Sequence, residues 1–373
     1  ALPRFKKMQI LVDRINLVAR EILTGLPVIR AFGREKKEEE RFDDANVALT
    51  KNMLFTNRVM TFMMPLMMFI MYGVSILIVW VSTDKINTGT IQVGTMTAFI
   101  TYSMQIVMAF LMITMFSVML PRASVSAERI DEVLNTKVSI EDKPDTNANP
   151  VANGEVAFEH VSFAYPGAKE NVLEDISFVA KTGQTTAIIG GTGSGKTTLV
   201  NLIPRFFDVT KGKVMVDGTD IREMSQESLR EAIGYVPQKG VLFSGTIASN
   251  LRYGKEDATK EQVMDAACIA QAKEIIDGKK DGLDSAIAQG GSNVSGGQKQ
   301  RFSIARAIVK DPKIYIFDDS FSALDYKTDA ILRRELSKKT KEAAVIIVAQ
   351  RISTILHAEQ IIVLNEGKVA GIG

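Results

Sequence analysis

Residues 185–197 read TTAIIGGTGSGKT, an apolar run followed at once by a glycine-rich loop. The run is typical of a buried strand, and the loop matches the G-x-x-x-x-G-K-[ST] pattern. Glycines let such a backbone curl so that its N–H groups point at phosphate oxygens. We therefore predict a phosphate site in which Lys196 faces the β and γ phosphates and Thr197 ligates Mg²⁺. The loop residues expected to contact a nucleotide are Gly190, Gly191, Thr192, Gly193, Ser194, Gly195, Lys196, Thr197 and Thr198.

A second apolar run, residues 314–317, ends in Asp318. Many buried strands end in Asp at a turn, but in P-loop NTPases an Asp at this place holds Mg²⁺. We therefore expect Asp318 to be a metal ligand. Further β-rich runs at 156–158 and 345–348 alternate with helical segments. This alternation predicts an α/β domain with a largely parallel sheet over residues 155–373.

Two uncharged stretches precede this domain. Residues 59–83 contain 25 residues and residues 86–121 contain 36 without one Asp, Glu, Lys or Arg. A helix of about 20 apolar residues crosses a bilayer, so we predict membrane helices at about 58–83 and 95–121, joined as a hairpin. Arg58 and Arg122 flank the hairpin, which favours a cytoplasmic location for both of its ends by the positive-inside rule. Trp80 is near the other end of the first helix, where an aromatic residue at the opposite membrane–water interface is expected. The alternative is a pair of buried helices in a soluble protein.

The segments on either side of the hairpin are polar. Residues 4–50 are strongly charged and are predicted to be long helix, and ten of the eleven residues 34–44 are charged. This charged elbow is either a solvated helix face or a surface that docks onto a soluble domain. Residues 135–154 are rich in Asn, Asp, Lys and Pro, which is typical of a linker. Residues 1–134 would then form the membrane part, with a cytoplasmic helix extension over residues 1–57.

Composition narrows the range of partners. The formal net charge is +2, from 45 basic and 43 acidic residues, which gives no reason to expect nucleic acid. Cys268 is the only cysteine, so no internal disulfide can form and a reducing compartment fits. The chain begins inside a predicted helix, so we expect it to be a piece of a longer protein.

Four short motifs carry a family resemblance. Residues 294–301 read VSGGQKQR, and they contain Ser295, Gly296, Gly297 and Gln298. With this sequence between the glycine-rich loop and Asp318, the chain resembles the ATP-binding-cassette (ABC) transporters, in particular type I exporter subunits. Tyr165, Gln238 and the sequence SALD at 322–325, which ends in Asp325, fall in the order of that family. The resemblance covers essentially the whole chain.

The resemblance implies a fold and a set of roles. The fold would be a partial α-helical transmembrane domain followed by an α/β P-loop ABC nucleotide-binding domain. Residues 59–120 would correspond to the last two of six membrane helices, and the charged segment near residues 31–40 to the coupling helix between the fourth and the fifth. The first three membrane helices, most of the fourth and a short tail after Gly373 would be absent. ATP and Mg²⁺ would be the cofactors, with Tyr165 stacked on adenine and Gln238 touching the metal. Residues 295–298 and Asp325 would meet a second half-transporter subunit across a dimer interface, in a bacterial cell membrane with the nucleotide domain in the cytoplasm.

Three positions depart from the family pattern. Asp319 stands where the family usually has the Glu that activates water, and Gln350 replaces the switch His. Gln289 lies near the place of a usual acidic residue. We therefore assign Lys196, Gln238, Asp319 and Gln350 as the catalytic set and expect this site to hydrolyse ATP poorly. The pattern resembles the degenerate half of bacterial heterodimeric multidrug exporters, and the alternative is a homodimeric lipid or peptide exporter with two working sites.

The membrane part offers a cargo hypothesis. Thirteen of the 17 methionines lie between residues 53 and 119, and five of them recur on one helix face: Met104, Met108, Met112, Met115 and Met119. Flexible methionine surfaces suit apolar or amphipathic small molecules, although a lipid-facing or helix-packing stripe explains them too. A soluble ABC protein would lack the two uncharged stretches, and an importer would have its ATPase on a separate chain. A regulatory nucleotide sensor is the other hypothesis for the degenerate site.

Overall fold

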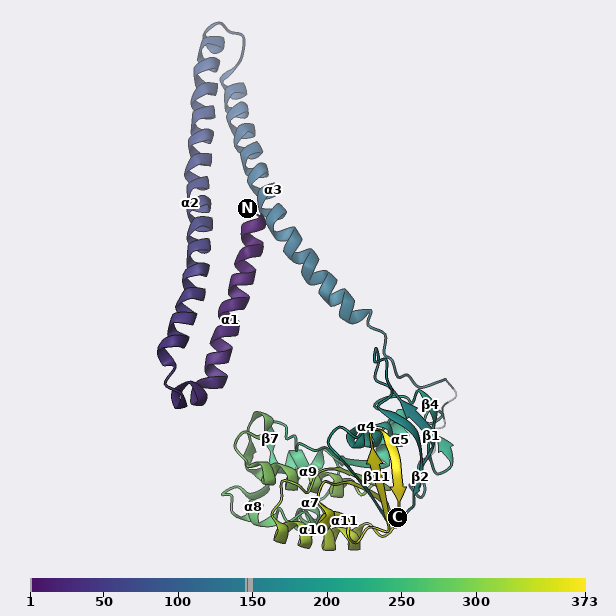
Figure 1. Cartoon of the computed structure of the whole chain (residues 1–373). Helices are drawn as coiled ribbons and strands as arrows, with labels where there is room; N and C mark the ends of the chain where they lie inside the picture. Colours follow the sequence, from purple (N-terminus) through teal and green to yellow (C-terminus); the bar gives the residue numbers. More distant parts are fainter. Residues whose placement is uncertain (1, 145, 147–149) are drawn as a thin grey trace. The chain divides into compact units, whose positions relative to one another are not determined.

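The computed structural model describes residues 2–144, 146 and 150–373 (Figure 1). The chain divides into two compact units, residues 1–137 and residues 138–373. The first unit is entirely helical over its described residues, and the second is a mixed α/β unit. A helical membrane region followed by an α/β nucleotide-binding fold is the architecture predicted from the sequence. The predicted domain limits themselves stay a prediction.

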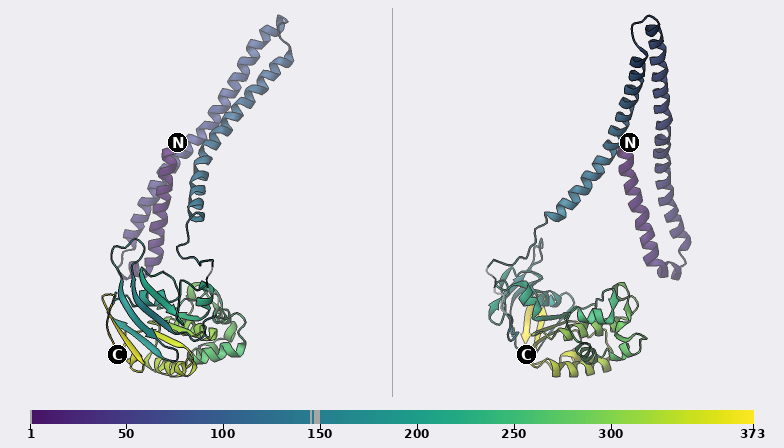
Figure 2. Two further views of the ribbon diagram at one scale, coloured as in Figure 1. Left: turned by 90° about the vertical axis from the view of Figure 1, so that its right-hand side faces the viewer. Right: turned by 180° about the vertical axis from the view of Figure 1, so that it is seen from behind.

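The first unit contains α1 (Leu2–Ala31), α2 (Glu35–Asn87) and α3 (Val93–Leu134). The segment 4–50 is helical but divided, because α1 and α2 are separate antiparallel helices in all three views (Figures 1 and 2). Gly33 explains the break, since its φ of 58° is a left-handed conformation that ends a helix. Arg41 on α2 pairs with Glu21 on α1 at 2.6 Å.

The hairpin of α2 and α3 is long and apolar. Within the part of the chain that the structure describes, α2 and residues Val93–Ile113 of α3 are the two helices able to cross a membrane by length and composition. Partly buried positions recur every three or four residues on α3 at Met96, Ile100, Ser103, Val107 and Leu111. This spacing is that of a helix face packed on a neighbour. The methionines at 104, 108 and 112 lie one position further along and are exposed.

The second unit is built on a six-stranded sheet in the order β12-β11-β3-β10-β9-β6. Its strands are β3 (Thr185–Gly190), β6 (Ile233–Val236), β9 (Ile314–Asp318), β10 (Ala344–Val348), β11 (Gln360–Asn365) and β12 (Lys368–Ile372). All neighbours are parallel except the edge strand β12. Every residue of β9 and β10 is buried, as a strand covered on both faces should be.

A second, antiparallel sheet has the order β2-β1-β4-β5. Its strands are β1 (Val156–Phe163), β2 (Leu173–Ala180), β4 (Lys211–Val216) and β5 (Thr219–Asp220). Buried residues of this sheet, such as Phe158 and Ile176, share one core with Ile316 and Ile346 of the central sheet. The pair β7 (Gly245–Thr246) and β8 (Ala286–Ile287) forms a small ribbon.

Helices cover the central sheet. They are α4 (Lys196–Leu202), α5 (Gln226–Glu231), α6 (Ile247–Arg252), α7 (Lys260–Ile269), α8 (Lys273–Asp277), α9 (Gly296–Lys310), α10 (Tyr326–Lys339) and α11 (Ile352–Ile355). Buried residues of α6, α7, α9 and α10 form a second core with Phe317 and Ile347, so that the sheet lies between two apolar layers. Short 3₁₀ turns at Gly282–Asp284 and Gln289–Gly291 complete the unit.

Two parts of the predicted linker are bound to the rest of the second unit. Positions 145 and 147–149 of the linker are not among the described residues. Asp142 accepts hydrogen bonds from Arg205 (3.3 Å) and from the Gln226 backbone N–H (3.0 Å). The Asp217 carboxylate accepts four backbone N–H groups of residues 152–155, each at 2.9 Å. The buried Arg205 and the four backbone donors around Asp217 fix this segment, although its composition is that of a flexible connection.

Candidate functional site

The predicted site residues gather at one edge of the central sheet. In parallel strands all carboxyl ends face the same way, so loops that follow neighbouring strands meet. The order β3-β10-β9-β6 places the glycine-rich loop beside Gln350, then Asp318 and Asp319, then Gln238. The register supports this alignment, because Val348 pairs with Ile188 on one side and with Asp318 on the other.

The glycine-rich loop wraps around the Lys196 side chain. Lys196 Nζ donates hydrogen bonds to the carbonyl oxygens of Gly190 (2.8 Å) and Gly191 (2.6 Å), and it is 3.4 Å from Ser194 Oγ. Gly195 caps α4 with a φ of 94°, and a Cβ there would lie 2.7 Å from Leu173 Cδ2. Only glycine fits this position, so the loop geometry depends on it.

Thr197 and Asp318 come together across the loop. Thr197 Oγ1 donates to Asp318 Oδ1 at 3.1 Å, and Asp318 is 2% exposed. Burial raises the pKa of the Asp318 carboxyl, while the Thr197 hydrogen bond opposes the shift. A hydroxyl and a carboxylate side by side are the hard oxygen ligands that Mg²⁺ prefers.

Asp319 is held by two amides. Its Oδ2 accepts hydrogen bonds from Gln350 Nε2 at 2.9 Å and from Gln238 Nε2 at 3.3 Å. The side chain is 8% exposed, and burial raises its pKa although the Gln238 bond opposes that shift. Asp319 has a φ of 46°, and its backbone N–H bonds to the Val348 carbonyl. One carboxylate oxygen is therefore shared between the two amide groups at the ends of β6 and β10.

Tyr165 lies against the start of α4. Its hydroxyl is 2.9 Å from Thr198 Oγ1, and its ring packs edge-on to Phe163 and Phe207 with centroids 5.0 and 5.2 Å away. The ring is thus positioned next to the phosphate loop, and its stacking on adenine stays a prediction. The structure brings Tyr165, the glycine-rich loop, Asp318, Asp319, Gln238 and Gln350 into one site.

Residues 295–298, which we call the signature, begin helix α9 and form no hydrogen bond with the phosphate loop among the described residues. Ser295 and Gln298 form a capping box at the start of α9, in which each side chain bonds the other's backbone N–H. A Cβ on Gly296 would meet no atom within 4 Å, and one on Gly297 would lie 3.3 Å from the Ala323 carbonyl. Asp325 caps α10 through the Thr328 N–H. The signature and the 322–325 loop therefore lie together and leave the Gly296 backbone open on one side.

These residues fit a Mg²⁺–nucleotide. The loop offers backbone N–H groups and a cation for phosphates, and Thr197 with Asp318 offers metal ligands. Among the described residues, no cluster of three or more His, Cys, Asp or Glu could hold a metal alone. Mg²⁺ is usually bound in this way, by one or two protein oxygens that leave the remaining positions for phosphate and water.

Sequence reasoning missed three contacts around the site. Tyr235 donates to Asn201 Oδ1 at 2.9 Å, and burial, with the nearby Asp318 charge, raises its pKa to about 12. Arg351 donates to the Ser322 carbonyl at 2.9 Å and so ties the end of β10 to the 322–325 loop. Gln300 of α9 bonds the backbone on both sides of Gln238. Nothing in the sequence marks these side chains apart from other polar residues.

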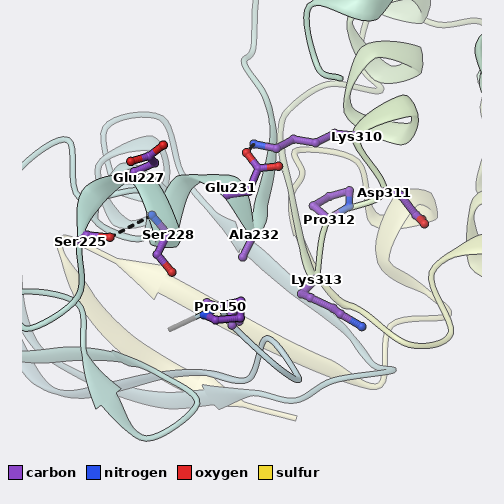
Figure 3. A pocket seen from close by; sticks show the side chains of 11 residues that line it. Pro150, Ser225, Glu227, Ser228, Glu231, Ala232, Lys310, Asp311, Pro312 and Lys313 are labelled. Atoms are coloured by element: carbon purple, nitrogen blue, oxygen red, sulfur yellow. Dashed lines mark hydrogen bonds and ion pairs between the residues drawn. The ribbon is translucent and has the colours of Figure 1, made fainter. Parts of the chain in front are cut away.

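A separate cavity of about 430 Å³ lies away from this edge (Figure 3). It is lined by Pro150, α5 and the 311–313 turn, and the side chains of Glu231 and Lys310 face each other there at 3.8 Å. Lys310 Nζ donates to the Arg230 carbonyl at 2.7 Å, so this cation is already partnered. The lining mixes both signs of charge and contains none of the predicted site residues.

Comparison with known proteins gives two family matches. Residues 173–322 match the ABC transporter family, and residues 2–110 match the ABC transporter transmembrane region. An uncharacterised ABC transporter ATP-binding protein of Mycobacterium tuberculosis is 46% identical over 100% of this chain and 64% of its own length. A putative multidrug export ATP-binding/permease protein of Bacillus subtilis is 37% identical, over 95% of this chain and 61% of its own length.

Two further relatives extend the comparison. An ATP-dependent lipid A-core flippase of Desulfotalea psychrophila is 35% identical, over 95% of this chain and 62% of its own length. A solved bacterial Atm1-family ABC exporter with ATP bound superposes with a TM-score of 0.84 at 29% identity, over 100% of this chain and 66% of that one. The chain thus spans less than two thirds of the length of these relatives.

Proposed function

Because this chain has the transmembrane region and the nucleotide-binding domain of an ABC exporter half-transporter, we propose that it belongs to an ATP-driven exporter. The observation that carries the proposal is the order within one polypeptide. Two apolar helices long enough to span a bilayer precede a phosphate loop and a signature sequence. This order favours an exporter subunit over a soluble ABC protein or an importer ATPase.

The phosphate edge supplies the groups that ATP hydrolysis needs. Lys196 exchanges its carbonyl partners for β and γ phosphate oxygens, and the loop N–H groups bind the same phosphates. Thr197 and Asp318, with Gln238 nearby, would hold Mg²⁺, which would supply positive charge against the phosphates. Tyr165 stacks on the adenine base, and this orients the nucleotide so that its γ-phosphate lies toward Asp319.

Asp319 and Gln350 make this site a weak one for hydrolysis. Asp is one methylene shorter than the usual Glu, and Gln cannot take up a proton as His can. The hydrogen bonds to Asp319 Oδ2 support this proposal, because they pull the short carboxylate toward the strand ends. A carboxylate that is one methylene short and held by two amides is poorly placed to orient an attacking water.

The signature completes a site on a second subunit. Ser295, Gly296 and Gly297 begin α9, and the Gly296 backbone is open to an approaching γ-phosphate. ATP would then hold two subunits together, one through its P-loop and the other through its signature. Since Asp319 and Gln350 alter the P-loop site while residues 295–298 keep the family sequence, we propose a different chain as partner, whose site this signature completes.

The cargo is an apolar or amphipathic compound in this proposal. Met108, Met112 and Met115 are about 60% exposed on a face that α2 leaves uncovered. Flexible thioethers adapt to apolar ligands of different shape. The Bacillus subtilis relative named as a putative multidrug exporter favours this class. The flippase relative supports a second candidate, a lipid, which would meet the same face.

The proposal is tested with the complete subunit and its partner in lipid vesicles. We expect ATP-dependent export of an amphipathic dye that stops when Lys196→Ala is introduced, because phosphate binding fails. Lys310→Ala, on the unrelated cavity, is the matched control and should keep transport. Dye export that persists without ATP would contradict an ATP-driven exporter, and movement of a labelled lipid but no dye would favour the second candidate.

A further inference from the structure

Gln300 is a buried amide with both ends occupied by another segment. It lies on α9, five residues after Ser295, and is 2% exposed. Its Nε2 donates to the Pro237 carbonyl at 3.2 Å, and its Oε1 accepts from the Gly240 N–H at 3.0 Å. These two backbone groups lie on either side of Gln238 and Lys239, just after the end of β6. The Gln300 amide therefore supplies the hydrogen bonds that a neighbouring strand would supply if β6 continued.

The segment from 237 to 240 is pressed onto α9. A Cβ on Gly240 would lie 2.9 Å from the Lys299 carbonyl oxygen and 3.0 Å from Ser303 Oγ. Glycine at this position therefore permits a close backbone approach, and any larger residue would push the segment away. A tight contact with two hydrogen bonds makes the segment follow the helix when the helix moves.

In the proposed dimer, α9 and the 237–240 segment lie next to two different nucleotides. The start of α9 carries the signature that meets the partner subunit's nucleotide. Gln238 carries the amide that bonds Asp319 Oδ2 at 3.3 Å in this chain's own site. A shift of the α9 start passes through Gln300 to Gln238 and from there to the Asp319 carboxylate.

We propose that Gln300 is a positioning residue that couples the nucleotide at the signature to Gln238 in the chain's own phosphate site. The proposal rests on the proposed function, because it needs ATP at the P-loop and at the signature. The chemistry requires an amide here. Only Asn and Gln offer a donor and an acceptor on one short planar group without charge.

Asn250 provides a matched control. It is also 2% exposed and also uses its amide on loop backbone, with Oδ1 accepting from the Phe243 N–H and Nδ2 donating to the Phe243 carbonyl, both at 2.8 Å. It thus serves the same structural purpose on the same loop, but it does not bond the groups next to Gln238. Asn250→Leu should destabilise the unit at least as much as Gln300→Met, because Asn250 Nδ2 also donates to the Thr246 carbonyl and its Oδ1 accepts from Arg306 Nη2, both at 3.0 Å.

The test measures hydrogen exchange and ATP turnover of the complete pump. In the wild type, a non-hydrolysable ATP analogue should slow exchange both at residues 295–299 and at 237–241. In Gln300→Met it should slow exchange at 295–299 alone. With the partner's P-loop inactivated, kcat of this chain's own site should fall roughly tenfold or more while KM stays near that of Asn250→Leu. Asn250→Leu should keep protection at both segments.

Two results would overturn the proposal. One is protection of both segments in Gln300→Met. The other is an equal loss of kcat in Gln300→Met and Asn250→Leu, which would give Gln300 a purely structural role. Gln300→Asn keeps a neutral amide with donor and acceptor but is one methylene shorter, so partial coupling is expected even if the Met variant folds poorly. A wild-type pump without turnover or protection would instead refute the proposed function itself.

Discussion

Replacing Asp319 with Glu should raise ATP hydrolysis at this chain's own site. The change adds one C–C bond of about 1.5 Å between the backbone and the carboxylate. In the present structure the carboxylate is drawn to the amides of Gln350 and Gln238, at 2.9 and 3.3 Å. Glu can keep one of these bonds and still reach further toward the phosphate loop.

The expected gain follows from the displacement. A misplacement of about 1 Å at a catalytic group costs roughly a hundredfold in rate, or about 2.7 kcal/mol of activation free energy. We expect Asp319→Glu to recover a large part of this factor, and Asp319→Glu with Gln350→His to recover more. Asp319→Asn is the matched control, since it keeps the size of the side chain and removes the charge.

The assay is ATP turnover of the complete pump whose second site has been inactivated in its P-loop. Under the proposal, wild type and Asp319→Asn show similar residual turnover, and Asp319→Glu exceeds both by at least an order of magnitude. The reasoning is refuted if the wild type already turns over rapidly and Asp319→Asn abolishes this turnover. Asp319 would then be a competent base at its own length.

Three further predictions test other parts of the account. Burial raises the pKa of Asp318 in the folded protein above its ordinary 3.8. Between these two pKa values the folded protein keeps the Asp318 proton and the unfolded chain loses it, so the free energy of unfolding falls as the pH rises. Over the same pH range Mg²⁺ binding strengthens, because the carboxylate loses its proton. Mg²⁺ titration of ATP-analogue binding from about pH 4 to 7 checks this, and a flat profile identical to that of Asp318→Asn would contradict it. Asp217→Asn removes one of two oxygens that accept four N–H groups and should loosen residues 150–155 by about 1 to 3 kcal/mol, visible as faster hydrogen exchange there and unchanged exchange in β9. Met112→Asp should reduce transport more than subunit assembly, whereas equal loss of both would assign the methionine face to helix packing.

Much of the site could be predicted because a parallel sheet imposes a simple rule. Once residues 185–190 and 314–318 are parallel strands, the loops after them must share an edge. This rule brings Lys196, Asp318 and Gln350 together without any knowledge of side-chain contacts. The hairpin of α2 and α3 was predictable for a similar reason, since a long uncharged run has few other folds.

Other features depend on single backbone positions that sequence patterns do not weigh. The charged run around residue 34 reads as one helix, but the left-handed Gly33 divides it into α1 and α2. The linker composition suggests freedom, yet Asp142 and Asp217 fix its ends. Composition cannot reveal these contacts, because their partners are 60 or more residues away in the sequence.

The side-chain network around Asp319 also lay beyond the sequence. Gln238, Asp319 and Gln350 could be named as site residues, but not the fact that both amides donate to the same carboxylate oxygen. Such sharing depends on the rotamers at the ends of three strands. The same applies to Gln300, whose partners are backbone atoms with no sequence signature.

The central claim is that this subunit binds ATP at a weak site and completes a strong one on a different partner. ATP turnover of the purified full-length subunit, alone and with the product of its genomic neighbour at matched concentration, tests this most directly. The account predicts little turnover for the subunit alone and robust turnover for the pair. Equal turnover of both preparations would contradict it and would make the protein a homodimeric pump in which Asp319 and Gln350 suffice.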